Sequence, residues 1–226
     1  SCAMALPDGK PLSIVCKARG FYDADRVPGP DLMPEMFKIS KEKGYRHYFY
    51  GSSQETLKKL REELNRNYPW LNIAGMYSPP YRALTQAEEE RIIREINDSK
   101  PDFIWVALGA PKQEEWMYRH RFQVRGVMIG VGAAFDFCAG TVRRAPAWMQ
   151  ELCLEWLYRL MQDPQRLFSR YFSTNISFLF KVAKENHKYR RENKDKKIAM
   201  IGHKRIPSRE GGVEIVVDEI STRLTE

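Results

Sequence analysis

The chain has 226 residues, of which 43% are apolar and 12% aromatic, and its formal net charge is +8. These values are typical of one sizeable α/β domain, with or without an appendage, and they exclude a chain that is disordered throughout. The apolar runs are short, so we expect no membrane-spanning segment. The four cysteines include no CxxC pair, which favours buried thiols in a reducing cytosol over a zinc site.

The first part of the chain alternates strand-like and helix-like patterns. Residues 10–19 fit either a strand or a first helix. The segments that follow are predicted, in order, as a helix over 31–43, a strand over 46–50, a helix over 54–67, a strand over 72–77, a helix over 85–97, a strand over 103–108, a helix over 112–122 and a strand over 127–131. This alternation predicts an α/β fold with a Rossmann-like, doubly wound and mostly parallel sheet.

The chain changes character after Pro146, where the strands stop. We predict helices over 147–161 and 164–191, the second with an aromatic stripe on one side and basic residues on the other. Between Gly140 and Lys197 there are 13 Lys and Arg against six Asp and Glu, so most of the excess positive charge lies here. Such helices either lie in a membrane interface or pack the aromatic stripe on their own domain, and both alternatives stay open.

The remaining residues are predicted as a linker followed by the start of a second domain. Residues 185–196 are densely charged and are predicted as a linker. Residues 197–226 start again with a strand-like run and a glycine-bearing loop, as a fresh Rossmann-like domain does. The domain prediction is therefore 1–146 for the main domain, 147–184 for a helical appendage, 185–196 for the linker and 197–226 for a truncated second domain.

Polar residues follow two neighbouring strands of the main domain. Gly109, Lys112 and Gln113 come after the strand 103–108, and Gly132 and Asp136 come after the strand 127–131. In an α/β sheet, ligands bind in the crevice beyond the carboxyl ends of the strands. Amide, carboxylate and guanidinium groups at two such ends, the last from Arg143 and Arg144, predict a site for a phosphorylated sugar.

Several motifs occur in one order along the chain. They are PDG, RVPGPDL, YFYGSS, ALGAPKQEEW, GVGAAFDFCAGTVRRAPAWMQ and LEWLYRL, and they extend from about Leu6 to about Val182. In this order the sequence resembles the WecG/TagA/CpsF glycosyltransferases, which form glycosyltransferase family 26. Residues 197–226 resemble the first strand and glycine loop of a different, two-Rossmann-domain glycosyltransferase.

The resemblance implies a function. Members of this family transfer an N-acetylmannosamine-type or related sugar from a UDP donor to a polyprenyl-diphosphate-linked acceptor. They work as peripheral proteins on the cytoplasmic face of the cell membrane, invert the anomeric centre, need no metal or other cofactor, and serve teichoic acid or other cell-surface polysaccharides. Members usually carry some fifty further residues before the PDG motif, and we expect that this chain starts inside a longer one. Homo-oligomers are also known in the family, so the oligomeric state stays open.

The resemblance also assigns roles to residues. Asp8 matches the proposed catalytic base, although an Asp-Gly pair is more often a turn or a helix cap. Arg26 matches an active-site arginine, for which the alternative is a surface ion pair with Asp23 or Asp25. The substrate-binding residues are then Arg26, Gly51, Gly109, Lys112, Gln113, Gly132 and Asp136.

Arginines of the appendage region are assigned to the lipid diphosphate. They are Arg143, Arg144, Arg159, Arg166 and Arg170, each of which alone would be an ordinary solvated charge. Asp23-Ala24-Asp25 matches the DxD pattern of metal-dependent glycosyltransferases, but it follows no predicted strand, and we interpret it as a coincidence.

Two other functions fit parts of the sequence. A basic nucleic-acid-binding module would use the positive segment and its aromatic residues, but no RRM, KH or helix-turn-helix signature is present. A Rossmann dehydrogenase would use the GVG motif, but the GxGxxG spacing is missing. We therefore expect a glycosyltransferase that does not bind nucleic acid.

Overall fold

The computed structural model describes residues 4, 6–18, 21–152, 154–162, 164–165 and 182. The predicted linker 185–196 and the predicted second domain 197–226 lie outside these residues. So does almost all of the predicted helix 164–191, including Arg166 and Arg170.

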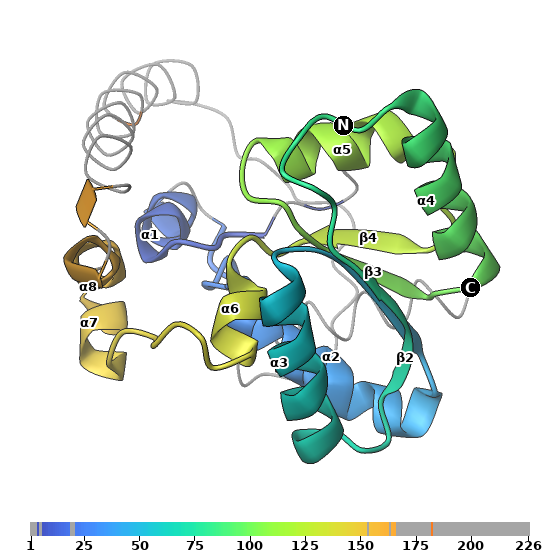
Figure 1. Cartoon of the computed structure of the whole chain (residues 1–226). Helices are drawn as coiled ribbons and strands as arrows, with labels where there is room; N and C mark the ends of the chain where they lie inside the picture. The colour runs from blue at the N-terminus through green and yellow to red at the C-terminus, as the bar shows by residue number, and fades with distance from the viewer. Residues whose placement is uncertain are drawn as a thin grey trace.

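Four strands form one parallel sheet. They are β1 (Arg46–Gly51), β2 (Asn72–Tyr77), β3 (Phe103–Ala107) and β4 (Val127–Gly130), in the order β2-β1-β3-β4. The chain moves outward from β1 to β2 and then returns to place β3 on the other side of β1 (Figure 1). The strand order therefore reverses between β1 and β3, which is where open α/β sheets bind their ligands.

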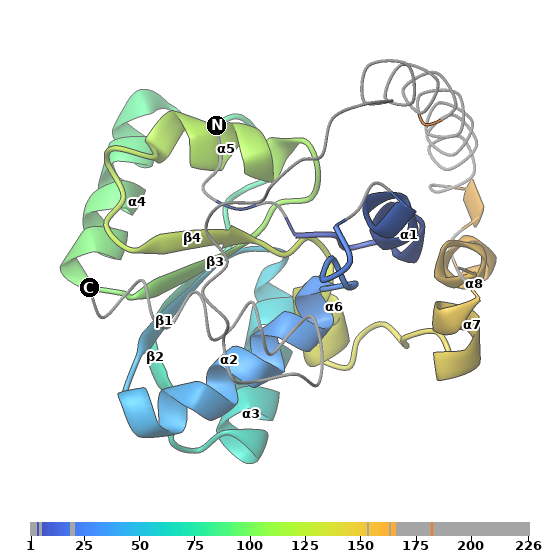
Figure 2. The same cartoon turned by 180° about the vertical axis from the view of Figure 1, so that it is seen from behind.

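Helices cover both faces of the sheet. On one face lie α2 (Gly29–Lys43), α3 (Gln54–Asn67) and the short α6 (Ala134–Cys138), and on the other lie α4 (Gln86–Asp98) and α5 (Lys112–His120) (Figures 1 and 2). This arrangement confirms the prediction of a Rossmann-like, doubly wound parallel sheet.

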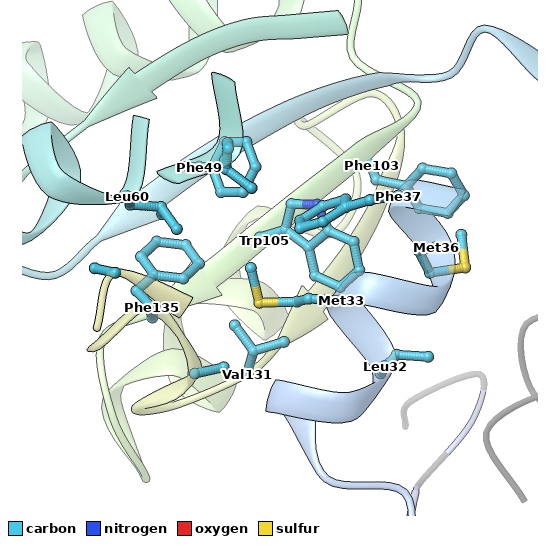
Figure 3. Close-up of a cluster of buried hydrophobic side chains, with 14 of the residues drawn as sticks. Leu32, Met33, Met36, Phe37, Phe49, Leu60, Phe103, Trp105, Val131 and Phe135 are labelled. Carbon is cyan, nitrogen blue, oxygen red and sulfur yellow. The ribbon is translucent and has the colours of Figure 1, made fainter. Parts of the chain in front are cut away.

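The two faces have separate hydrophobic cores because successive strand residues point to opposite sides. Phe49, Phe103 and Trp105 face α2 and α3, where they meet Phe37 and Leu60 (Figure 3). The residues between them in the strands face the other way and form the second cluster with α4 and α5; they are Tyr48, Tyr50, Ile104 and Val106. Each strand of the central pair is therefore buried on both sides, as parallel strands usually are.

Local signals explain where the helices begin and end. Thr85 and Glu88 form a complete capping box at the start of α4, and Ser53 caps α3 by accepting a hydrogen bond from the N–H of Thr56 at 3.1 Å. Gly44 ends α2 in the left-handed conformation, with φ of 69°. The structure also settles residues 10–19, because Lys10–Ala18 forms a helix, α1.

The prediction of one helix over 147–161 was wrong. The structure has two, α7 (Ala147–Glu151) and α8 (Glu155–Gln162), with a turn between them in which the N–H of Leu154 donates to the carbonyl of Met149 at 2.7 Å. Residues five apart on a continuous helix point in directions about 140° apart. The turn instead lets Gln150 and Glu155 contact the same arginine, as described below.

Helices α1, α7 and α8 gather at one end of the molecule, beyond α6, in both views (Figures 1 and 2). Because α6 follows β4, this is the end to which the carboxyl ends of the strands point. None of the helices within the described ranges combines the length and hydropathy that crossing a bilayer requires.

A buried polar chain runs through the core next to the sheet. The indole N–H of Trp105 donates to Nδ1 of His47 at 3.0 Å, so the ring carries its proton on Nε2 and donates it to Oγ of Ser40 at 2.8 Å. Ser40 in turn donates to the carbonyl of Met36 at 2.7 Å. Each side-chain polar group in this series of hydrogen bonds thus has a partner. Burial lowers the pKa of His47 to about 3.

Candidate functional site

The carboxyl ends of β1 and β3 lie backbone against backbone. A Cβ atom on Gly51 would come within 2.5 Å of the carbonyl oxygen of Ala107, and φ of Gly51 is 118°. The next residue, Ser52, donates its N–H to the same oxygen at 3.0 Å. Gly51 is therefore required by close packing of the two strand ends, which brings the N-terminus of α3 to the point where the strand order reverses.

Gln113 joins the loops that follow β3 and β4. Its side chain is only 8% exposed; Oε1 accepts a hydrogen bond from the N–H of Gly132 at 3.0 Å, and Nε2 donates to Glu114 at 2.9 Å. The amide thus holds the two predicted ligand loops together. Lys112 is exposed at the start of α5.

Two glycines leave open space at these loops. Gly109 and Gly132 have φ of 77° and 55°, and a Cβ atom on either would meet nothing within 4 Å. Their backbones are accessible to a ligand, whereas the backbone at Gly51 is closed by its neighbour.

Asp136 lies in α6 and points to α3. Its Oδ1 accepts a hydrogen bond from Oγ1 of Thr56 at 3.2 Å. The sequence did not predict α6, because its five residues give no recognisable period. The carboxylate of Asp136 therefore belongs to the junction between β4 and the N-terminal turn of α3.

Asp8 lies beside Arg26 in a second group of polar residues. The N–H of Val27 donates to the carbonyl of Pro7 at 2.8 Å, and Nε of Arg26 donates to the backbone carbonyl of Asp8 at 2.9 Å. The two segments thus run side by side, and Asp8 lies at the edge of the cluster, where part of the residue is open to solvent while the arginines crowd its carboxyl group.

Opposing effects act on the carboxyl group of Asp8. Loss of hydration raises its pKa above the ordinary 3.8, the positive charges of Arg159, Arg26 and Arg144 act in the opposite direction, and the negative charge of Glu155 adds to the rise. The net shift is upward, which makes Asp8 a stronger base than a freely solvated aspartate.

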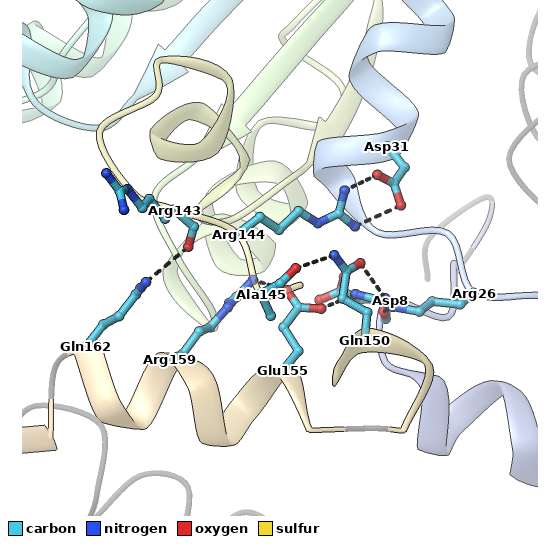
Figure 4. Close-up of polar contacts among 10 residues, drawn as sticks. All are labelled: Asp8, Arg26, Asp31, Arg143, Arg144, Ala145, Gln150, Glu155, Arg159 and Gln162. Atoms are coloured by element: carbon cyan, nitrogen blue, oxygen red, sulfur yellow. Dashed lines mark hydrogen bonds and ion pairs between the residues drawn. The ribbon is translucent and has the colours of Figure 1, made fainter. Parts of the chain in front are cut away.

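The arginines around Asp8 are held by the appendage (Figure 4). Arg26 donates to Oε1 of Gln150 at 3.2 Å and forms an ion pair with Glu155. Arg159 donates to the other oxygen of Glu155 at 3.0 Å, and its guanidinium lies 4.8 Å from the ring centre of Phe137. Residues of α6, α7 and α8 thus all contact Arg26 or Arg159.

The two hinge arginines differ. Arg144 forms a two-pronged ion pair with Asp31 at the start of α2, with one N–O distance of 2.9 Å. Arg143 is exposed, and it contacts the cluster through its backbone carbonyl, which accepts a hydrogen bond from Nε2 of Gln162 at 3.2 Å (Figure 4). The alternative ion pair of Arg26 with Asp23 or Asp25 is not the one found, since Arg26 pairs with Glu155 and Asp25 pairs with Lys17.

Helix α6 and the loop before it connect the two groups of residues. Asp136 reaches α3, while its neighbour Phe137 contacts Arg159. At the start of α2, a Cβ atom on Gly29 would lie 3.0 Å from the carbonyl oxygen of Val131. Asp8 and Gln113 make their contacts in different groups of residues, and the short stretch after β4 joins these two groups.

Partners that sequence reasoning missed are Thr56, Asp31, Gln150 and Glu155. Arg26 and Glu155 are 129 residues apart, and Arg144 and Asp31 are 113 apart, so no local pattern links them. In the described part of the chain, no three His, Cys, Asp or Glu side chains are grouped as metal ligands would be.

An open groove of about 260 Å³ lies elsewhere, between α2, α3 and α6. It is lined by Pro34, Phe37, Leu64 and Tyr68 among others, and it shares only Arg144 with the residues predicted for the site. The strand-end loops do not reach it, so we place the candidate site at the reversal of strand order.

The fold and these loops define an α/β protein with a Rossmann-like parallel sheet, polar groups beyond the carboxyl ends of its strands, and an arginine fixed next to Asp8. The chain belongs to the glycosyl transferase WecG/TagA/CpsF family, whose model matches residues 1–192. This match ends before the predicted second domain.

Several curated relatives share one name. The chain is 35% identical over 163 residues to an N-acetylglucosaminyldiphosphoundecaprenol N-acetyl-beta-D-mannosaminyltransferase of Bacillus subtilis (strain 168), over 71% of this chain and 61% of the relative. Proteins of that name from Staphylococcus aureus (strain MW2) and Bacillus spizizenii are 34% and 35% identical, over 74% of this chain and 64% and 63% of their own lengths. The chain thus spans less than two thirds of the length of these relatives.

Proposed function

We propose that this chain carries the transferase centre of an inverting glycosyltransferase of teichoic acid or related cell-surface polysaccharide synthesis. The donor would be a UDP-linked N-acetylmannosamine-type sugar, and the acceptor a polyprenyl-diphosphate-linked N-acetylglucosamine. Family membership and the names of the relatives support the reaction class. The observation that carries the proposal is Asp8, a carboxylate of raised pKa among three arginines at the carboxyl end of the sheet.

In the proposed step, Asp8 takes the proton from the attacking acceptor hydroxyl. The acceptor oxygen forms a bond to the anomeric carbon from the face opposite UDP, the bond from that carbon to the UDP oxygen breaks, and UDP leaves with the electron pair. A base is most effective when its pKa approaches the working pH, so an upward shift at Asp8 favours this role.

The donor is proposed to lie over the reversal of strand order. The accessible backbones of Gly109 and Gly132 would allow close approach of the sugar nucleotide, and the N-terminus of α3 beyond Gly51 suits an anion. Lys112 supplies a positive charge nearby, while Gln113 and Asp136 hold the loops in place. Guanidinium and backbone N–H groups, rather than a metal, would stabilise the negative charge that grows on the leaving UDP.

The acceptor diphosphate is proposed to meet the arginines next to the appendage. Arg144 and Arg159 lie in the described cluster, and the assignments of Arg143, Arg166 and Arg170 stay predictions. Exposed apolar side chains on and beside α7 and α8 would face the lipid headgroups of the cytoplasmic membrane surface; they are Trp148, Leu152, Trp156 and Met161.

Transfer from UDP-N-acetylmannosamine to a short-chain lipid-diphosphate N-acetylglucosamine tests this proposal. We expect Asp8→Asn to lower kcat by about 10²- to 10⁴-fold, the usual contribution of a general base, with little change in affinity for UDP. Asp25→Asn is the matched control, because it removes a half-buried aspartate that pairs with Lys17. Normal turnover by Asp8→Asn would refute the assignment of the base, and no transfer by the unsubstituted chain would count against the function.

A further inference from the structure

Glu155 joins two arginines that come from distant parts of the chain. One carboxylate oxygen accepts from Arg159 in the same helix, and the other pairs with Arg26, which precedes α2 (Figure 4). The side chains of Glu155 and Arg26 are only 16% and 15% exposed, so the pair is largely shielded from solvent. A shielded pair of this kind holds its geometry better than a surface pair does.

Gln150 reinforces the same contact. Its Nε2 donates to the carbonyl of Ala145 at 2.7 Å, while its Oε1 accepts from Arg26 at 3.2 Å. The turn between α7 and α8 makes this possible, because it brings Gln150 and Glu155 to one side. The appendage therefore supplies two acceptors for the guanidinium of Arg26.

We propose that Glu155 is a positioning residue of the transferase site, which fixes Arg26 and Arg159 beside Asp8 only when α8 is docked on the main domain. The inference rests on the proposed function, but its geometric part concerns the contacts of Glu155 alone. An arginine side chain has many rotamers, and a carboxylate that binds two guanidinium groups removes this freedom before substrate arrives.

The charges that face Asp8 come from three segments. They are Arg159 and Glu155 of α8, Arg26 before α2, and Arg144 of the hinge, which is itself paired with Asp31 of α2. Removing the negative charge of Glu155 would leave the arginines less neutralised. The pKa of Asp8 should then fall, because nearby positive charge favours the carboxylate form.

The test uses the full chain with Glu155→Gln and the control Glu151→Gln, which removes one exposed carboxylate from the same appendage. Titration of Asp8 by carbon NMR should give a lower pKa in Glu155→Gln and an unchanged one in Glu151→Gln. The Nε–H signals of Arg26 and Arg159 should show larger-amplitude motion only in Glu155→Gln. Unchanged titration and unchanged arginine signals in folded Glu155→Gln would overturn the inference.

Kinetics separate this inference from the proposed function. In an active chain, Glu155→Gln should lower kcat/KM about tenfold or more and move its acidic limb to lower pH, with partial recovery in Glu155→Asp. If the chain is active and Glu155→Gln changes neither its rate nor its pH profile, the positioning role is refuted and the transferase assignment stays intact. An inactive chain that still shows the NMR changes supports the positioning of the arginines and refutes the transferase assignment alone.

Discussion

At the scale of single residues, Asp8 combines a proposed function with a cost in stability. Its pKa in the folded chain is raised above 3.8, so folding favours the protonated form. The stabilisation that this gives is complete below pH 3.8 and is lost as the pH rises through the pKa of the folded state. At neutral pH the ionised carboxylate therefore opposes folding slightly, as groups retained for activity often do.

We expect Asp8→Asn to melt at a higher temperature than the unsubstituted chain at pH 7. The difference should shrink as the pH falls and vanish below about pH 3.8, since both side chains are then neutral. Thermal unfolding by circular dichroism between pH 3 and 8 measures this. A lower melting temperature for Asp8→Asn at pH 7 would show that the carboxylate stabilises the fold instead.

The contribution of His47 to stability changes with pH in the direction opposite to that of Asp8. Its pKa is about 3 in the folded chain against an ordinary 6.5, so its neutral form contributes stability above pH 6.5 that is lost as the pH falls toward 3. The difference between these two pKa values corresponds to a loss of about 4 kcal/mol of unfolding free energy at pH 3. His47→Gln should unfold more easily at pH 7, because the hydrogen bonds to Trp105 and Ser40 are disturbed.

The test is the slope of unfolding free energy against pH. Between pH 6.5 and 4, urea titrations should show a smaller loss of stability in His47→Gln than in the unsubstituted chain. Parallel pH profiles for the two proteins would mean that His47 does not titrate as described.

At the scale of elements, the junction of β1 and α3 depends on Gly51. Replacement by alanine would put Cβ 2.5 Å from the carbonyl oxygen of Ala107 at an unfavourable φ of 118°. We expect Gly51→Ala to lower the unfolding free energy by about 3 kcal/mol, against about 1 kcal/mol for Gly44→Ala, which has φ of 69° and open space around it. Urea unfolding measures both, and equal losses would contradict the close packing at Gly51.

The sequence predicted the regular elements well and the irregular ones poorly. Helix α3 and strand β2 have the predicted bounds, because leucine spacing, capping residues and flanking turns are local signals. Helix α6 and the turn between α7 and α8 were missed. Both are short, and their conformations depend on contacts with α3 and Arg26 rather than on their own periodicity.

At the scale of the whole molecule, the position of the site follows from topology and its details do not. Alternating strands and helices predicted that the loops at Gly109 and Gly132 would lie at one edge of the sheet, and they do. The partners of Arg26 and Arg144 could not be predicted, because they lie more than a hundred residues away along the chain. Likewise, the burial of the Gln113 amide depends on the adjacent placement of β3 and β4.

The proposed function places a UDP-sugar over the reversal of strand order between β1 and β3. Hydrogen exchange of backbone amides with and without UDP tests it most directly. We predict protection in residues 51–53, 109–113 and 130–136, and little change along the groove between α2 and α3. Protection confined to that groove, or no protection anywhere at millimolar UDP, would rule out this position of the donor.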